Sequence, residues 1–119
     1  ARVYSAVTGD EVTREELEAK GMKILHLFRA LTARQMGEAD QRTKHDMIPD
    51  WVFHYPEDKE AFTPGHDKMD VDDMELAKDM LYEQMGWDKA TGMPTRDTLA
   101  SFGLDDVADA LAAQGLLPA

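Results

Sequence analysis

Four histidines are the first side chains that could bind a metal or transfer a proton: His26, His45, His54 and His66. No two of them stand three or four residues apart, the spacing that puts two imidazoles on one face of a helix in motifs such as H-E-x-x-H. The sequence therefore favours surface or hydrogen-bonded histidines over a metal site.

An acidic run, D-K-M-D-V-D-D at positions 67–73, could supply oxygen ligands for calcium. A calcium loop of the EF-hand type needs a glycine at its sixth position and a glutamate at its twelfth. Counted from Asp67, these positions hold Asp72 and Lys78, and a loop counted from Asp70 lacks both residues as well. Capping of a helix that starts after Asp70 is the better interpretation of the run.

Serine and threonine hydroxyls are present, but nothing in the sequence places a general base beside one, and no glycine-rich phosphate loop occurs. The chain has no cysteine, which removes thiol nucleophiles, disulfides and iron–sulfur ligands from these 119 residues. We therefore predict that it contains no catalytic, cofactor-binding or metal-binding residue, and that it has no activity by itself.

Methionine and tryptophan could form an adaptable binding surface, since the chain has eight methionines and two tryptophans. Met74, Met80 and Met85 recur at helical spacing, however, which is more typical of a helix face in a protein core. Trp51 and Trp87 are likewise expected to be buried anchors.

The elements that position these residues begin with a short apolar run at positions 3–7. We expect it to be helical and to end at Gly9, because glycine adopts the left-handed conformation without a Cβ penalty. So few residues precede this glycine that we expect the helix to begin before Ala1. We therefore expect the chain to be a C-terminal fragment of a longer protein.

The longest helix is predicted at about 14–36. Thr13 and Glu16 form a capping box at its start, and Gly37 is the expected stop. Gly21 within it suggests a close helix neighbour at that point. We expect the buried stripe of this helix to consist of small and apolar residues at helical spacing: Leu17, Gly21, Ile24, Leu25, Phe28, Leu31 and Thr32.

Periodicity fades over positions 38–70. Pro49 is expected to start one helical turn, with Trp51, Val52 and Phe53 as anchors, and positions 55–56 and 63–65 carry turn signals. So long an irregular stretch is uncommon in a free-standing compact domain, and is usually functional or packed on something else.

Three further helices are predicted after this stretch. The first runs from the cap Asp70 to Gly86, the second opens at Pro94-Thr95 and closes at Gly103, and the last ends at Gly115. Their expected buried residues are Met74, Ala77, Met80, Leu81 and Met85, then Leu99 and Phe102, then Leu104, Val107, Ala108, Leu111 and Ala112. No strand alternation of useful length appears. The predicted fold is all-α: an irregular bundle of three to five helices that forms a single helical domain over residues 1–119.

The charge balance restricts the partners. There are 24 acidic and 13 basic residues, for a net charge of −11, and no basic stripe interleaved with aromatics. Such a surface repels phosphate, so we expect binding neither to nucleic acid nor to membrane. The apolar runs are also far shorter than the roughly 20 residues that a membrane span needs. Absence of cysteine and of targeting signals favours a cytoplasmic location.

Several segments, taken in order, resemble the C-terminal end of the aldehyde:ferredoxin oxidoreductase family, whose members are tungsten- or molybdenum-pterin enzymes. The most specific part begins with the Gly86-Trp87-Asp88 turn and leads through Pro94-Thr95 to Gly103-Leu104. The corresponding region of the family reads G-W-D-x-x-G-x-P-T-x-x-x-L-x-x-L-G-L. The matching segments are Y-S-A-V-T-G at 4–9, T-x-x-E-L at 13–17, the helix end at 27–37, D-x-x-P at 46–49, and the whole stretch 82–104.

The sequence departs from the family's pattern at several points. Asp10 replaces an aromatic residue, and A-R-Q-M-G at 33–37 replaces N-x-R-E-G with one extra residue. Met85 replaces an arginine or a similar residue, and residues 54–67 look unlike a typical member. These departures leave the fold assignment intact and put the subfamily and the substrate in doubt.

The resemblance implies a helical scaffold domain of a much larger catalytic subunit. Such enzymes oxidise aldehydes to carboxylic acids with a tungsten- or molybdenum-bis-pterin and a 4Fe–4S cluster, and pass the electrons to ferredoxin. The segments that hold these cofactors lie before this chain, so no site residue is carried over onto it. If any part approaches a substrate channel we expect residues 34–45, for which a surface loop is the better interpretation. The partners implied are the N-terminal remainder of the enzyme and ferredoxin.

A second hypothesis from a different class stays open. The chain could be a stand-alone acidic helical interaction module or small subunit, which binds another protein through an apolar surface. Because the first helix is expected to be truncated, we also expect the isolated chain to associate with itself and so to cover exposed apolar surface.

Overall fold

The computed structural model describes residues 1–54 and 70–118. Its helices are α1 (Arg2–Thr8), α2 (Arg14–Met36), α3 (Gln41–Lys44), the 3₁₀ turn η1 (Asp50–Val52), α4 (Val71–Met85), α5 (Arg96–Ser101) and α6 (Asp105–Ala113). These two ranges contain no β-strand, only an isolated bridge between Trp87 and Pro94. The all-α prediction is confirmed. The turns expected at positions 55–56 and 63–65, and also His66 and Asp67, lie outside the described residues.

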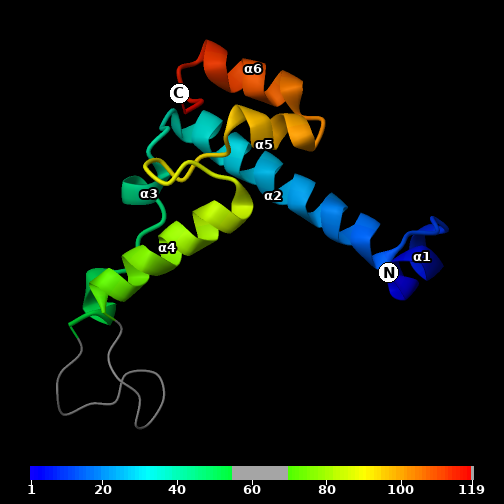
Figure 1. Ribbon diagram of the computed structural model, residues 1–119, viewed down its shortest axis with the longest axis horizontal. Coiled ribbons are helices and arrows are strands. Elements are labelled where there is room, and N and C mark those ends of the chain that lie inside the picture. The colour runs from blue at the N-terminus through cyan, green and yellow to red at the C-terminus, as the bar shows by residue number, and fades with distance from the viewer. Residues whose placement is uncertain (55–69, 119) are drawn as a thin grey trace, which may run out of the picture.

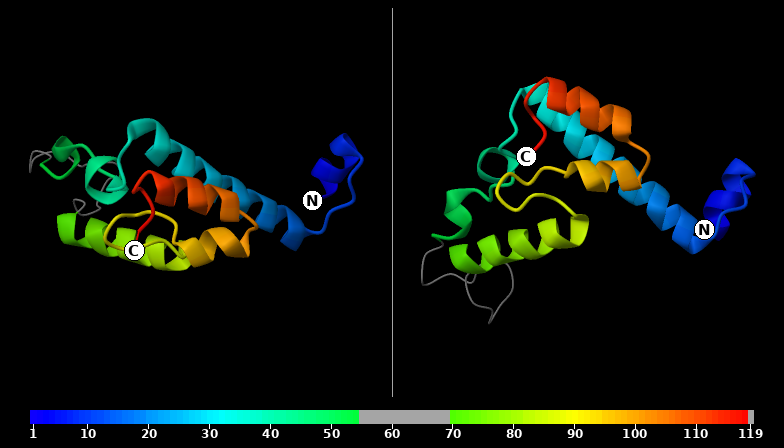
Figure 2. Two further views of the ribbon diagram at one scale, coloured as in Figure 1. Left: turned by 90° about the horizontal axis from the view of Figure 1, so that it is seen from above. Right: turned by 45° about the horizontal axis from the view of Figure 1, so that its top comes forward.

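Helix α2 is the axis of the arrangement (Figure 1). The C-terminal pair α5 and α6 pack on each other, and α6 packs on α2. Helix α4 runs at a steep angle to α2, and α1 lies at the far N-terminal end of α2, away from α6 (Figures 1 and 2). The core residues that α2 contributes, Ala30 and Ala33, lie in its C-terminal half.

The helix ends follow the local sequence signals. Thr13 Oγ1 accepts a hydrogen bond from the Glu16 N–H at 3.1 Å, and a Glu16 carboxylate oxygen accepts one from the Thr13 N–H at 2.8 Å, which completes the predicted capping box. Asp70 caps α4 by accepting from the Asp72 N–H at 2.7 Å. Gly37 and Gly86 end α2 and α4 as predicted, with φ of 64° and 66°.

The core lies between the C-terminal half of α2, the turn after α4, and the C-terminal segment. Two alanines of α2 face it, and their small side chains let α6 approach closely. Its buried members are Ala30, Ala33, Met93, Leu99, Leu104, Ala108, Leu111 and Leu116. Burial of Leu99 and of most of the expected face of α6 was predicted, whereas Met93 in the preceding turn was not.

The buried stripe predicted for α2 is wrong. Ile24, Leu25 and Phe28 are 64%, 50% and 68% exposed, and the buried side of α2 instead carries His26 and the two alanines. The reason is tertiary, because apolar residues lie on several sides of the C-terminal half of this helix, and within residues 1–54 and 70–118 only the side with His26, Ala30 and Ala33 is buried. The close neighbour expected at Gly21 is also absent, since a Cβ at that position would meet nothing within 4 Å among the described residues.

The stripe predicted for α4 is wrong as well. Met80 and Leu81 are 65% and 50% exposed, and Ala77 is exposed, whereas Lys78 and Tyr82 are buried. Two isolated predictions fail in the same way: Trp51 is 59% exposed, although Val52 beside it is buried, and Ala112 of α6 is exposed. None of the helices in the described ranges has the length and apolar character needed to cross a bilayer.

Candidate functional site

A half-buried ion pair and a tyrosine join three distant parts of the chain. Asp46 accepts hydrogen bonds from two nitrogens of Arg29 on α2, at 2.8 and 2.5 Å, and one from the hydroxyl of Tyr82 on α4, at 2.6 Å. These three residues, here called the Asp46 cluster, are separated by 17 and 36 positions in sequence. The geometry is the two-pronged guanidinium–carboxylate pairing that gives the strongest charge-assisted hydrogen bonds.

The electrostatics of the Asp46 cluster hold its protons in place. Burial raises the pKa of Asp46, but hydrogen bonds from Arg29 and Tyr82 outweigh it, and the net pKa lies below the ordinary value. Burial raises the pKa of Tyr82, and its hydrogen bond to the carboxylate raises it further. At neutral pH the carboxylate is charged and the phenol is protonated, so neither group is prepared to donate or accept a proton.

A second arginine links α3 to α4. Arg42 bonds Glu75 at 2.6 and 3.1 Å and Asp79 at 2.5 Å, and it also donates to the backbone carbonyl of Lys89 at 2.7 Å. The hydrogen bonds with the Asp79 and Glu75 carboxylates raise the pKa of Arg42 above its usual value. The guanidinium also lies 5.6 Å from the ring centre of Tyr82, so it extends the Asp46 cluster along α4.

His26 is fully buried and accepts the indole N–H of Trp87 at Nδ1, at 2.9 Å. In the neutral ring the proton is therefore on Nε2, which has no hydrogen-bond partner in the described part of the chain. Phe102 packs on the imidazole at 4.6 Å between ring centres, and Arg29 lies 4.5 Å above the indole. Burial lowers the pKa of His26, and the ring is held as a neutral structural group.

The turn between α4 and α5 completes this region. The Asp88 carboxylate accepts from both the N–H and the hydroxyl of Thr91, at 2.8 and 2.6 Å. Gly92 has φ of 72°, and a Cβ there would lie 3.0 Å from the Tyr82 hydroxyl and 3.3 Å from the Asp46 carboxylate. Only glycine fits both the conformation and the space, so the turn is shaped to the Asp46 cluster.

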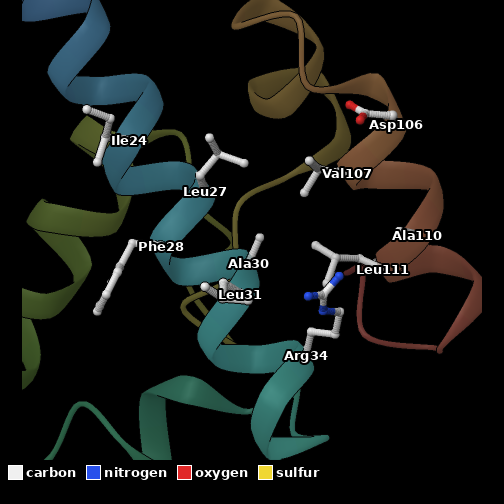
Figure 3. A pocket seen from close by; sticks show the side chains of 10 residues that line it. All are labelled: Ile24, Leu27, Phe28, Ala30, Leu31, Arg34, Asp106, Val107, Ala110 and Leu111. Atoms are coloured by element: carbon white, nitrogen blue, oxygen red, sulfur yellow. The ribbon is translucent and has the colours of Figure 1, made fainter.

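The candidate site for a ligand or partner is a separate feature, a groove of about 520 Å³ between α2 and α6. Figure 3 shows that its walls are mostly apolar, with the guanidinium of Arg34 directed toward Leu111 at one end and Asp106 at the other. Its lining residues are Ile24, Leu27, Phe28, Ala30, Leu31, Arg34, Asp106, Val107, Ala110 and Leu111. We call this feature the α2–α6 groove.

Two further predictions concern the histidines and the segment 34–45. His54 pairs with Asp50 at 3.3 Å, and no group of three or more histidine, aspartate or glutamate side chains within residues 1–54 and 70–118 could hold a metal. Segment 34–45 is not simply a surface loop, since it contains the end of α2 and α3, and Gln41 is fully buried. Its approach to a substrate channel stays a prediction.

Sequence reasoning missed the Asp46 cluster as a unit. One signal was available: Arg29 stands three residues after His26 and four before Ala33, on the side of α2 that carries the small and polar residues. A side that is small and polar within an otherwise apolar helix indicates a specific buried contact. The prediction for α2 was based on its apolar residues, so it did not use this signal.

Fold and geometry together define an all-α structure, whose polar residues hold its helices together. Residues 1–104 match the family described as "Aldehyde ferredoxin oxidoreductase, domains 2 & 3". The chain belongs to this family. The match includes the Asp46 cluster, His26 and Trp87, and it ends before α6. No solved structure matches the chain.

Proposed function

We propose that this chain is a helical scaffold domain of an aldehyde:ferredoxin oxidoreductase-like enzyme, and that residues 1–119 act as one domain. In the complete enzyme an aldehyde and water would give a carboxylic acid, two protons and two electrons, and ferredoxin would take the electrons. The observation that supports the proposal is the family match over residues 1–104, which contains every member of the Asp46 cluster.

The contribution of this chain is mechanical. Arg29 and Asp46 neutralise each other, and Tyr82 fixes the carboxylate, so the cluster holds α2 and α4 at one angle without moving a proton. Such internally satisfied polar groups specify one arrangement of helices. A domain of this kind provides a rigid surface against which the rest of a catalytic subunit can pack.

The cofactors of the family would be held elsewhere in the subunit. A 4Fe–4S cluster requires thiolate ligands, and these 119 residues contain no cysteine. The described residues also offer no group of metal-binding side chains. The bis-pterin metal would supply the oxidation chemistry, and the described residues of this chain do not fit the role of its ligands.

Exposed apolar side chains support a place within a larger assembly. Four apolar residues are each 59–68% exposed: Ile24 and Phe28 of α2, and Leu76 and Met80 of α4. The axes of these two helices lie at a steep angle to each other (Figure 1). Large contiguous apolar surfaces are rarely left open to water in stable proteins. We place the enzyme in the cytoplasm, an assignment supported by the absence of cysteine.

The test is the intact mass of the protein from its native source, with metal analysis of the same sample. A subunit several times heavier than 13.4 kDa, with tungsten or molybdenum and about four irons, is the expected result. A native subunit of 13.4 kDa without metal would contradict the proposal.

The same exposed side chains favour the second candidate, a stand-alone acidic interaction module or small subunit. The genomic reading frame separates the two. Several hundred residues upstream with C-x-x-C-type cluster ligands support the enzyme domain, whereas a start codon directly before Ala1 supports the module.

A further inference from the structure

The α2–α6 groove has the form of a seat for another helix. Ala30 and Leu111 are buried core residues that also line it, so the groove is continuous with the core of the domain. Small side chains, Ala30 and Ala110, stand among larger ones such as Phe28, and leave room for the ridge of side chains that an inserted helix presents.

The two charges of the groove lie at its opposite ends. Arg34 is near the C-terminal end of α2 and Asp106 is in the first turn of α6 (Figure 3). Both side chains are exposed, and within the described part of the chain neither forms an ion pair or a side-chain hydrogen bond. A binding partner can therefore engage each charge without breaking an existing contact.

We propose that an amphipathic helix from the part of the enzyme subunit outside these 119 residues lies in the α2–α6 groove; this rests on the proposed function. Its apolar ridge contacts Phe28, Leu31 and Val107, an acidic side chain pairs with Arg34, and a basic side chain pairs with Asp106. The groove follows α2 from Ile24 to Arg34, which is about 15 Å at 1.5 Å per residue, or nearly three helical turns.

The shape of the groove favours a helix over a second copy of this chain. A second copy that used the same face would place one concave surface against another and would leave the groove unfilled. A convex helix fills the groove and meets both charges at once.

The test uses two matched variants of the full-length subunit, Ala110→Cys and Ala112→Cys. Both alanines are exposed on α6, but only Ala110 lines the groove, and the natural segment has no cysteine. The readout is the maleimide labelling rate of each introduced thiol, followed by mass spectrometry of its peptide and divided by the rate in denatured subunit. We expect labelling at position 110 to be at least tenfold slower than at position 112.

The charge part of the proposal is tested in the Ala110→Cys background. Arg34→Glu should speed labelling several-fold, because it places a second carboxylate beside the acidic partner, and Arg34→Lys should restore most of the protection. Equal labelling at positions 110 and 112 would overturn the proposal. So would protection that disappears on dilution of the subunit, since that result assigns the groove to a second copy.

The same samples distinguish this proposal from the proposed function. A subunit that carries its metal and labels rapidly at position 110 retains the enzyme assignment and loses the helix. A native chain of 13.4 kDa removes the enzyme assignment directly, whatever the labelling shows.

Discussion

The indole N–H of Trp87 lies 2.9 Å from Nδ1 of His26, and this hydrogen bond ties the middle of α2 to the turn that follows α4. The two residues are 61 positions apart. Because His26 is fully buried, loss of the donor leaves a buried acceptor without a partner. Loss of this hydrogen bond is therefore expected to lower the free energy of unfolding by more than loss of a solvent-exposed one.

Replacement Trp87→Phe should lower the free energy of unfolding by about 2–4 kcal/mol, from the unpaired acceptor and the lost ring volume. Urea unfolding followed by circular dichroism gives the measurement. Phe28→Leu is the control, since that residue is 68% exposed, and it should change stability by less than about 0.5 kcal/mol. Equal effects of the two variants would contradict the importance of the His26 bond.

The pH dependence of stability should show the buried histidine. The folded pKa of His26 is lowered by burial, so the unfolded chain binds its proton more readily than the folded chain does. The contribution of His26 to the free energy of unfolding is then fully present above its unfolded pKa of about 6.5, and it declines as the pH falls below that value. Unfolding in urea between pH 7.5 and 5.5 should show this decline.

The decline belongs to His26 if His26→Gln reduces the slope in that window, although the variant itself is less stable. A slope that persists in the His26 variant would assign it to other groups. Asp46, whose folded pKa is also lowered, acts in a different window: its contribution is present above the unfolded pKa of about 4 and is lost as the pH falls through the folded value.

Removal of the carboxylate from the Asp46 cluster should cost more than removal of its tyrosine hydroxyl. Asp46→Asn leaves the Arg29 guanidinium, whose side chain is only 13% exposed, without its counter-charge. We expect a loss of about 2–4 kcal/mol, against about 1–2 kcal/mol for Tyr82→Phe, which leaves the ion pair in place. Calorimetric or urea unfolding of the two variants gives the comparison. The reverse order would contradict the conclusion that the Arg29–Asp46 ion pair is the main stabilising contact of the Asp46 cluster.

The ends of the helices were predictable, whereas the buried faces of α2 and α4 were not. Thr13, Glu16, Asp70 and Gly86 act within one turn of their own positions, so local sequence contains the whole signal. Contacts such as Tyr82 with Asp46 join residues 36 positions apart, and periodicity carries no information about them. The exposure of Phe28 shows the converse limit, since an apolar pattern marks a helix face but does not identify what covers it.

The exposed apolar residues predict the behaviour of the isolated 119-residue chain. Sedimentation equilibrium at high micromolar concentration should show self-association, because Phe28 and Met80 are 68% and 65% exposed. Phe28→Ser should weaken the association several-fold and leave the helical circular dichroism signal unchanged, since Phe28 is not a core residue. A clean monomer of the natural chain at that concentration would contradict this expectation.

A pair of glycines separates backbone strain from steric contact. Gly37 and Gly92 have similar left-handed φ values of 64° and 72°. Among the residues that the structure describes, a Cβ at Gly37 would meet nothing within 4 Å, whereas one at Gly92 would meet Tyr82 at 3.0 Å. Gly37→Ala should therefore cost only the backbone term, about 1–2 kcal/mol. Gly92→Ala should cost more, by about a further 1–2 kcal/mol, because Tyr82 must move away from Asp46 to make room. The double variant Gly92→Ala with Tyr82→Phe should recover part of the difference if the clash is with the hydroxyl. Equal losses at the two glycines, measured by urea unfolding, would show that the turn is not fitted to the Asp46 cluster.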